Sequence, residues 1–254
     1  MSKILRLRGH EVLARRELLN KFYRLCRDDP LSAHCYSIYY LMREPHNLEL
    51  LIQENVESYV LIRYGGKFTI EDVYEVHIWN PISEVISEIV IRPSKRANVQ
   101  LHGNYVNSIL DEVIEHLKYL GFKEVHISEF HDMICDSESF RPSPLERLAV
   151  RLGEEHAQLY RDLEVERGVS ISLDEARRIL NEYLHYGVIV DDILVSVAAR
   201  YVTLPEIHII GGVFTRRKYR GRGYAKAVVS ALTREAISSR AFAGLQAERG
   251  NRVA

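Results

Sequence analysis

The chain has 254 residues, of which 46% are hydrophobic, so it can bury its own core in one large or two small domains. Its net charge of −1 argues against a general nucleic-acid-binding protein, because affinity for phosphate backbones needs a strong positive excess. No uninterrupted apolar run approaches the roughly 20 residues that span a bilayer, and the first residues lack the apolar core of a signal peptide, so we expect a globular cytoplasmic protein without a membrane partner.

The first half of the sequence contains both helical and strand-like patterns. Apolar residues at helical spacing predict helices over residues 11–27, 32–42 and 105–120. Runs rich in β-branched and aromatic residues predict strands at residues 59–64, 73–79, 85–91 and 122–130. The first three of these strands follow one another closely, which indicates an antiparallel meander.

Residues 136–144 contain three serines and two prolines and are the only stretch whose composition suggests a linker. We therefore place a domain boundary there. Residues 1–140 are expected to form an α/β domain, and residues 145–254 a second domain.

The second domain has a regular order of predicted elements. Strands are expected at residues 148–152, 188–190, 193–202 and 207–215, and helices at residues 154–167, 172–184 and 224–238. Ser172 and Glu175 have the spacing of a capping box, in which the serine accepts a backbone hydrogen bond and the glutamate reaches back. The order β, α, α, β, β, β, α, with a last strand at residues 243–247, predicts an α+β fold with a mixed sheet.

The three cysteines, Cys26, Cys35 and Cys135, are an odd number without metal-ligand spacing. We expect them to be reduced and mostly buried, with neither a disulfide framework nor a zinc site. A second group of possible metal ligands consists of His126, Glu129, His131 and Asp132. Their mixed spacing at the end of an expected strand is more typical of solvated loop residues, so no metal is expected.

The segment most informative about function is residues 219–225, Tyr-Arg-Gly-Arg-Gly-Tyr-Ala, between an expected strand and an expected helix. A glycine-containing turn at the start of a helix leaves backbone N–H groups without partners, where an anion can bind. Basic residues gather around this turn: Arg216, Arg217, Lys218, Arg220, Arg222 and Lys226. The segment therefore predicts a small polyanionic ligand.

Three other motifs fit this segment less well. A dinucleotide-binding G-x-G-x-x-G is disfavoured because Lys226 stands at the third glycine position and the expected order is mostly antiparallel. A nucleotide P-loop is absent from the sequence. An RNA-binding glycine-arginine box would be repeated and disordered, whereas this one is single and lies between apolar elements.

Residues 220–225 match every fixed position of the signature Arg or Gln, two residues, Gly, one residue, Gly or Ala. In this signature and in the element order after Leu148, the chain resembles the GNAT superfamily of acyl-CoA-dependent N-acyltransferases. It is also similar to a two-domain subgroup in which a degenerate N-terminal half precedes the active half. The resemblance implies a GNAT fold in the C-terminal half and a GNAT-like N-terminal half.

The resemblance also implies that acetyl-CoA is the co-substrate, with its pyrophosphate at the glycine turn. Gly221 and Gly223 would let the backbone approach the phosphates, and the helix that begins with Tyr224 and Ala225 would add partial positive charge. Arg220 and Arg222 would then add charge-assisted hydrogen bonds or hold the 3′-phosphate of the coenzyme.

The strand before the turn is implied to hold the pantetheine arm of the coenzyme. Val213, Phe214 and Thr215 would lie beside this arm, with backbone groups of Val213 and Thr215 bonded to it. The glycine pair at 211–212 is consistent with a bulge that splays this strand from the next.

Residues 248–254 resemble a second family segment, Glu-x-x-Asn-x-x-Ala, which begins a helix. Asn251 matches the family asparagine near the pantetheine end of the coenzyme. In the family this helix continues and further strands complete the sheet, so we expect the chain to be truncated by several tens of residues.

Acetylation of an amine needs a base, because only the neutral amine attacks the thioester. The family often places a glutamate on the strand before the glycine turn, and Glu206 and His208 are the candidates in that neighbourhood. An exposed strand-end carboxylate and a buried histidine with satisfied hydrogen bonds are the alternative interpretations. The family's acid, frequently a tyrosine, would lie on the helix beyond Asn251.

The resemblance thus implies an N-acetyltransferase that transfers acetyl from acetyl-CoA directly to an amine of a small molecule or protein. Two alternatives stay open. One is a catalytically silent acyl-CoA-binding regulatory protein; in the other, the N-terminal half binds a partner and delivers a protein or RNA substrate. The acceptor amine and the oligomeric state have no signature in the sequence.

Overall fold

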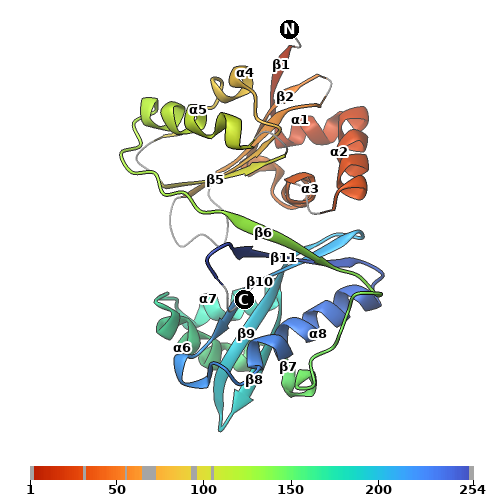
Figure 1. Cartoon of the computed structure of the whole chain (residues 1–254), viewed down its shortest axis with the longest axis vertical. Coiled ribbons are helices and arrows are strands. Elements are labelled where there is room, and N and C mark those ends of the chain that lie inside the picture. The colour runs from red at the N-terminus through yellow and green to blue at the C-terminus, as the bar shows by residue number, and fades with distance from the viewer. Residues whose placement is uncertain are drawn as a thin grey trace. The chain divides into compact units, whose positions relative to one another are not determined.

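The computed structural model describes residues 3–30, 33–54, 56–64, 73–92, 96–103 and 106–251. The chain divides into two compact units, one up to Ser128 and one from Glu129 onward. Each unit is built around its own mixed sheet with helices on both faces, which confirms the predicted α+β class (Figure 1). No helix among the described residues is long and apolar enough to cross a membrane.

The first unit contains a five-stranded sheet in the order β1-β2-β3-β4-β5. The strands are β1 (Ile4–Arg8), β2 (Leu48–Gln53), β3 (Tyr59–Tyr64), β4 (Val73–Trp79) and β5 (Arg96–His102). Neighbouring strands are antiparallel except β4 and β5, which are parallel. The helices are α1 (Gly9–Ala14), α2 (Arg16–Asp28), α3 (Ala33–Arg43), α4 (Ser83–Ile86) and α5 (Val106–Tyr119). Helices α1 to α3 lie on one side of this sheet and α4 and α5 on the other (Figure 1).

The apolar pattern predicted most helices of the first unit and two of its strands. Strands β3 and β4 have the predicted bounds, and α5 lies within the predicted helix, whose first residue, Tyr105, is outside the described residues. The helix expected over residues 11–27 is interrupted at Arg15, where α1 ends and α2 follows.

Two strands predicted in the first unit are wrong. Residues 85–91 begin in α4 and continue as turns and irregular chain; their alternate apolar residues are buried against the sheet, which gave the strand-like pattern. Residues 122–129 are irregular, and a strand begins only at Phe130. Strands β1, β2 and β5 were not predicted; β2 is buried on both faces and therefore shows no alternation.

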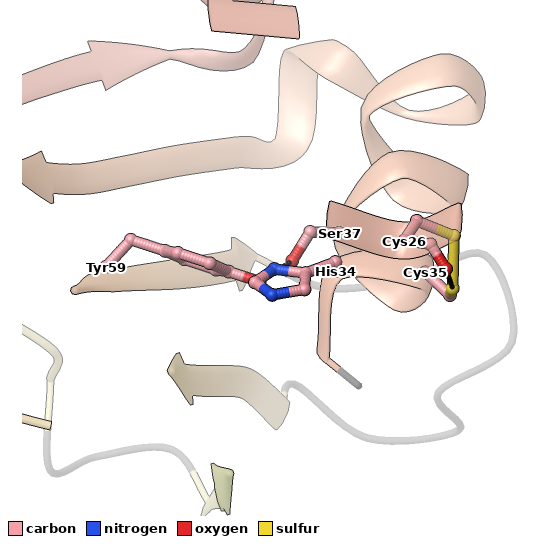
Figure 2. Close-up of a disulfide and its surroundings, with 5 residues drawn as sticks. All are labelled: Cys26, His34, Cys35, Ser37 and Tyr59. Carbon is pink, nitrogen blue, oxygen red and sulfur yellow. Dashed lines mark hydrogen bonds between the residues drawn. A yellow bond between two sulfur atoms is a disulfide. The ribbon is translucent and has the colours of Figure 1, made fainter. Parts of the chain in front are cut away.

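A disulfide joins Cys26 of α2 to Cys35 of α3 (Figure 2). The prediction that these two cysteines are reduced is therefore wrong, whereas Cys135 is a free thiol. The two helices fold back on each other, which brings the Cα atoms of the pair to 5.1 Å, within the range that a disulfide spans. This proximity depends on helix packing, and the spacing of the cysteines in the sequence gave no sign of it.

The second unit contains a six-stranded sheet in the order β6-β11-β10-β9-β8-β7. The strands are β6 (Phe130–Cys135), β7 (Ala149–Leu152), β8 (Leu184–Val190), β9 (Ile193–Thr203), β10 (Ile207–Thr215) and β11 (Phe242–Glu248). Only β10 and β11 are parallel neighbours. Helices α6 (Ala157–Arg167) and α7 (Leu173–Glu182) pack on one face, and α8 (Tyr224–Ser238) packs on the other (Figure 1).

Each strand and helix predicted between residues 145 and 247 is present in the structure. Strand β10 and helix α8 have the predicted bounds, and β8 begins four residues earlier than predicted. The capping box is confirmed, because the Glu175 amide donates to Ser172 Oγ at 3.2 Å and the Ser172 amide donates to Glu175 Oε2 at 2.8 Å.

The expected linker, residues 136–144, lies inside the second unit. Strand β6, which precedes it, pairs with β11 along its whole length, and the Ser143 amide donates to Ser230 Oγ of α8 at 2.9 Å. The two units separate between Ser128 and Glu129 instead. Serine and proline therefore mark an irregular connection within the second unit.

The two units repeat one order of elements. In the first unit, β1 is followed by helices, then β2, β3 and β4, then α4 and the parallel strand β5. In the second unit, β7 is followed by α6 and α7, then β8, β9 and β10, then α8 and the parallel strand β11. The corresponding features of the two units can therefore be compared directly.

Candidate functional site

The glycine turn connects β10 to α8 and has an unusual backbone conformation. Gly221 has φ of +75° and Gly223 has φ of +80°, both in the left-handed region that side chains other than glycine rarely adopt. A Cβ on Gly221 would meet nothing within 4 Å, and one on Gly223 would meet only Leu145, at 3.1 Å. The backbone conformation, more than crowding, therefore requires glycine, and the turn is open on the outside of Gly221.

Helix α8 begins directly after this turn without a cap. Gly223 is the N-cap residue, no side chain accepts a hydrogen bond there, and the first turn contains no acidic residue. The amides of Tyr224, Ala225 and Lys226 have no partner within the helix, because the first bond is that from the Ala227 amide to the Gly223 carbonyl at 3.0 Å. This helix start therefore offers N–H donors and partial positive charge to an anion.

Two exposed arginines lie on the turn itself. Arg220 donates through Nε to the Thr215 carbonyl at 3.0 Å, and the guanidinium of Arg222 lies 5.5 Å from the centroid of the Tyr219 ring. Both contacts involve the guanidinium group and hold it close to the turn.

Arg216, by contrast, has a structural role. Its Nη1 lies 2.5 Å from Glu166 Oε2 on α6, and its Nε donates to the Leu194 carbonyl at 2.7 Å. This arginine ties the start of the turn to α6 and β9.

Strands β10 and β11 diverge before the glycine turn. Four residues of β10, from Ile207 to Ile210, pair with Phe242 to Leu245. The rest of β11 pairs only with β6, so within the described residues β10 has no partner on β11 from residue 211 to residue 215. Along this edge the backbone groups lack a strand partner on β11, although the Thr215 carbonyl accepts from Arg220 Nε.

A bulge lies on this open edge, as the glycine pair predicted. The register of β10 with β9 shifts between Gly211 and Phe214, and Gly212 has φ of +60°. Val213 is 37% exposed on the bulge. Residues 213–215 thus line the gap that β11 leaves.

Asn251 lies just beyond the end of β11. Its amide donates to the Glu248 carbonyl at 2.8 Å, which closes a turn through Arg249 and Gly250. The three residues after it, for which the sequence predicted the continuation of a helix, lie outside the described residues.

The two residues predicted to be catalytic lie near the start of β10, away from the glycine turn. Glu206 precedes the strand, and its carbonyl accepts from the Phe242 amide at 2.9 Å. At about 3.3 Å per residue, it lies about 30 Å along the strand from Thr215.

His208 is buried on the α8 face, and its Nδ1 lies 3.5 Å from Arg200 Nη1. Burial, together with the nearby charge of Arg200, lowers the pKa of His208 to about 4. The structure brings neither Glu206 nor His208 to the bulge or to the turn.

A polar cluster that the sequence did not predict lies beside the bulge, on the face that α6 and α7 cover. It consists of Glu164, Arg167 and Tyr201. The Tyr201 ring lies over Gly211, and a Cβ on Gly212 would be 2.2 Å from the Tyr201 hydroxyl oxygen. These residues come from α6 and β9, so only the folded sheet brings them together.

In the described part of the first unit, the parallel pair β4 and β5 shows no equivalent opening. All seven residues of β4 pair with β5, and the Asn80 amide donates to the His102 carbonyl at 3.0 Å just beyond the last pair. The connection that follows is Asn80-Pro81-Ile82 and contains no glycine.

Aromatic side chains fill the α3 side of the first sheet. The Tyr59 hydroxyl is hydrogen-bonded to His34 Nδ1 at 3.0 Å and to Ser37 Oγ at 3.1 Å (Figure 2). His77 stacks on Tyr36, with 5.4 Å between the ring centroids. Among its described residues, the first unit thus has neither the divergent strands nor the glycine turn of the second.

No protein-family model matches the sequence, and no curated protein matches it either. Among solved structures, the chain is similar to a tandem GNAT protein from the clavulanic acid biosynthesis pathway, with 10% identity, a TM-score of 0.53, and 99% of this chain and 91% of that chain covered. It is also similar to a GCN5-related N-acetyltransferase-like protein from Streptococcus suis 89/1591, with 17% identity, a TM-score of 0.51, and coverage of 91% and 89%.

A third similar structure is a GNAT-family protein from Novosphingobium aromaticivorans DSM 12444, with 23% identity, a TM-score of 0.42 and coverage of 50% of this chain. The match spans 55% of that protein, or about half its length. The first two similarities extend over both units and agree with the element order described above. The chain therefore has the GNAT fold, in two halves.

Proposed function

We propose that this chain is an acetyl-CoA-dependent N-acetyltransferase whose second unit binds the coenzyme and transfers its acetyl group to an amine. The observation that carries the proposal is the pair of left-handed glycines placed directly before the uncapped helix α8, beside strands that have separated. Pyrophosphate is suited to such a helix start, because several N–H groups can reach it at once. The two similar structures that span both units, a tandem GNAT protein and a GCN5-related N-acetyltransferase-like protein, support the same activity.

We assign the phosphates of the coenzyme to the glycine turn of the second unit. Gly221 and Gly223, with the amides of Tyr224 and Ala225, would bind the pyrophosphate, and Arg220 and Arg222 would bind the 3′-phosphate. Acetyl-CoA supplies an activated acyl group, and the protein's task is to orient it and to exclude water.

The pantetheine arm carries amide groups and would lie along the open edge of β10. There, backbone groups of residues 213–215 would bond to it in place of the missing β11 residues. Asn251 would lie near the pantetheine end. The positions of Glu206 and His208 do not support a role as the base at the acyl end of this arm.

The first test is binding of CoA and acetyl-CoA to the wild-type chain and to Gly221→Ala, measured by calorimetry. An added Cβ would stand on the open side of the turn, where the phosphates approach, so we expect affinity for both ligands to fall by about tenfold or more, about 1.4 kcal/mol or more. Gly168→Ala is the matched control, because Gly168 also has a left-handed φ, of +94°, and also has nothing within 4 Å of an added Cβ. It ends α6 and should leave binding unchanged.

Equal losses in the two variants would mean that backbone strain, and not a phosphate site, explains the effect. Absence of binding to the wild-type chain would overturn the proposal. Turnover is tested separately by release of free thiol from acetyl-CoA over a panel of small amines. Binding without thiol release from any amine would favour the silent acyl-CoA-binding alternative.

A further inference from the structure

Tyr201 occupies an irregular position in β9. The register of β9 with β10 passes from Val202, opposite Ile209, to Arg200, opposite Ile210, so Tyr201 has no partner and is the extra residue of a bulge. Bulges of this kind turn a side chain away from the regular alternation of the strand. A second bulge, at Gly212, follows on the facing strand.

The Tyr201 side chain lies across β10 because the strand has no side chains there. Its ring carbons are 3.1 Å from the Cβ position of Gly211, and its hydroxyl oxygen is 2.2 Å from the Cβ position of Gly212. Any side chain other than hydrogen at residue 212 would collide with the hydroxyl. The glycine pair therefore lets a tyrosine of β9 reach the part of β10 from which β11 has separated.

Two charged residues of α6, Arg167 and Glu164, lie near the Tyr201 hydroxyl. Arg167 is close enough to the hydroxyl to act on it electrostatically, and the same arginine lies 3.5 Å from Glu164 Oε1, a carboxylate that is 6% exposed. Burial raises the pKa of Tyr201, and the charge of Arg167 opposes this rise. Arginine has no acceptor atom, so Arg167 cannot take up the hydroxyl proton of Tyr201, which can be donated to another acceptor.

We propose that Tyr201 donates its hydroxyl hydrogen bond to the acyl carbonyl oxygen of bound acetyl-CoA, with Arg167 and Glu164 as positioning residues. This inference rests on the proposed function. Tyr201 is then a catalytic residue, since its hydrogen bond strengthens as negative charge develops on that oxygen during attack by the neutral amine. The amine nitrogen forms the new bond to the acyl carbon, the carbon–sulfur bond breaks with its electron pair on sulfur, and the proton lost by nitrogen balances the one gained by the thiol. Tyr201 keeps its proton throughout.

The test compares two ligands of nearly equal size, acetyl-CoA and S-ethyl-CoA, which lacks the carbonyl oxygen. Affinities of the wild-type chain, Tyr201→Phe and the neighbouring control Tyr183→Phe are measured by calorimetry, after thermal melts have shown that the variants are folded. We expect Tyr201→Phe to weaken acetyl-CoA binding about threefold to tenfold, the range of one neutral hydrogen bond, and to leave S-ethyl-CoA unchanged. Tyr183→Phe should change neither affinity, although its ring centroid lies only 5.3 Å from that of Tyr201.

Each outcome supports or overturns the inference. An unchanged ratio of the two affinities in Tyr201→Phe, with wild-type binding intact, overturns the role of Tyr201 and leaves the proposed function standing. An equal loss for both ligands also overturns it, because the hydroxyl would then act on the shape of the site. A wild-type chain that binds neither ligand overturns the proposed function itself.

Discussion

Among the described residues, four histidines are buried, and burial keeps all four neutral at pH 7. Burial lowers the pKa of His34 and His185 to about 4 and that of His77 to about 3. It also lowers the pKa of His208 to about 4. The ordinary pKa of histidine is about 6.5. Between about pH 6.5 and 4, therefore, the unfolded chain binds more protons at these positions than the folded chain does.

We expect the free energy of unfolding to be highest above about pH 6.5 and to fall as the pH is lowered through this window. Each histidine contributes a slope of at most about 1.4 kcal/mol per pH unit. Denaturant unfolding between pH 7.5 and 5 measures this slope, in a range where most carboxylates still carry their charge. His77→Phe keeps a ring in the aromatic stack and removes one titrating group, so its slope should be shallower. Identical slopes in the variant and the wild type would contradict the prediction.

Among single residues, the sequence could predict those whose role depends only on their neighbours along the chain. Gly221 and Gly223 could be placed because a tight turn before a helix demands left-handed residues close together in the chain. Tyr201 could not be placed, because its significance arises from two bulges and from the absence of side chains on a different strand. Glu206 and the glycine turn lie beyond opposite ends of β10, as the predicted bounds of that strand already implied.

Among the elements, α2 and α3 are held together by the Cys26–Cys35 disulfide. The crosslink closes a loop with a sequence separation of 9, and such a short loop stabilises by about 2–3 kcal/mol through restriction of the unfolded chain. We expect the double variant Cys26→Ala/Cys35→Ala to unfold at a lower temperature than the wild type. Addition of a reductant should lower the unfolding temperature of the wild type and leave that of the double variant unchanged.

Cys135→Ala is the control for this comparison, because Cys135 is a free thiol on β6 and should respond to reductant as the wild type does. Mass spectrometry of a non-reduced digest tests the pairing directly. Recovery of Cys26 and Cys35 as free thiols from oxidised protein would contradict it.

How well an element could be predicted depended on its apolar pattern and on the residues that bound it in the sequence. Strand β10 and helix α8 were predicted to their last residues, because strong periodicity is bounded there by turn-forming residues. Strand β5 is only partly buried and has a mixed polar sequence, so no pattern marked it. Residues 85–91 were wrongly predicted as a strand, because a short helix and the turns after it can bury the same alternate positions as a strand.

At the scale of the whole molecule, the two units share one order of elements and differ in whether the parallel pair of strands stays together. Strands β4 and β5 keep seven paired residues, whereas β10 and β11 keep four. If coenzyme binding requires the separation, only the second unit can bind it. We therefore expect one acetyl-CoA per chain, measured as the stoichiometry of the calorimetric titration or by native mass spectrometry. Two bound molecules per chain would show that the closed pair of the first unit is not a barrier.

The separation of β10 from β11 also has a consequence for stability. The first sheet satisfies its parallel edge with its own backbone, so its stability does not depend on any small molecule. On the proposed function, the second sheet leaves several rungs of its ladder to be completed by the pantetheine amides, and the coenzyme then acts as a missing strand. Since a ligand that binds only the folded state stabilises it in proportion to the logarithm of its concentration, the supply of acyl-CoA in the cell would set how firmly one half of the chain is folded and leave the other half unaffected.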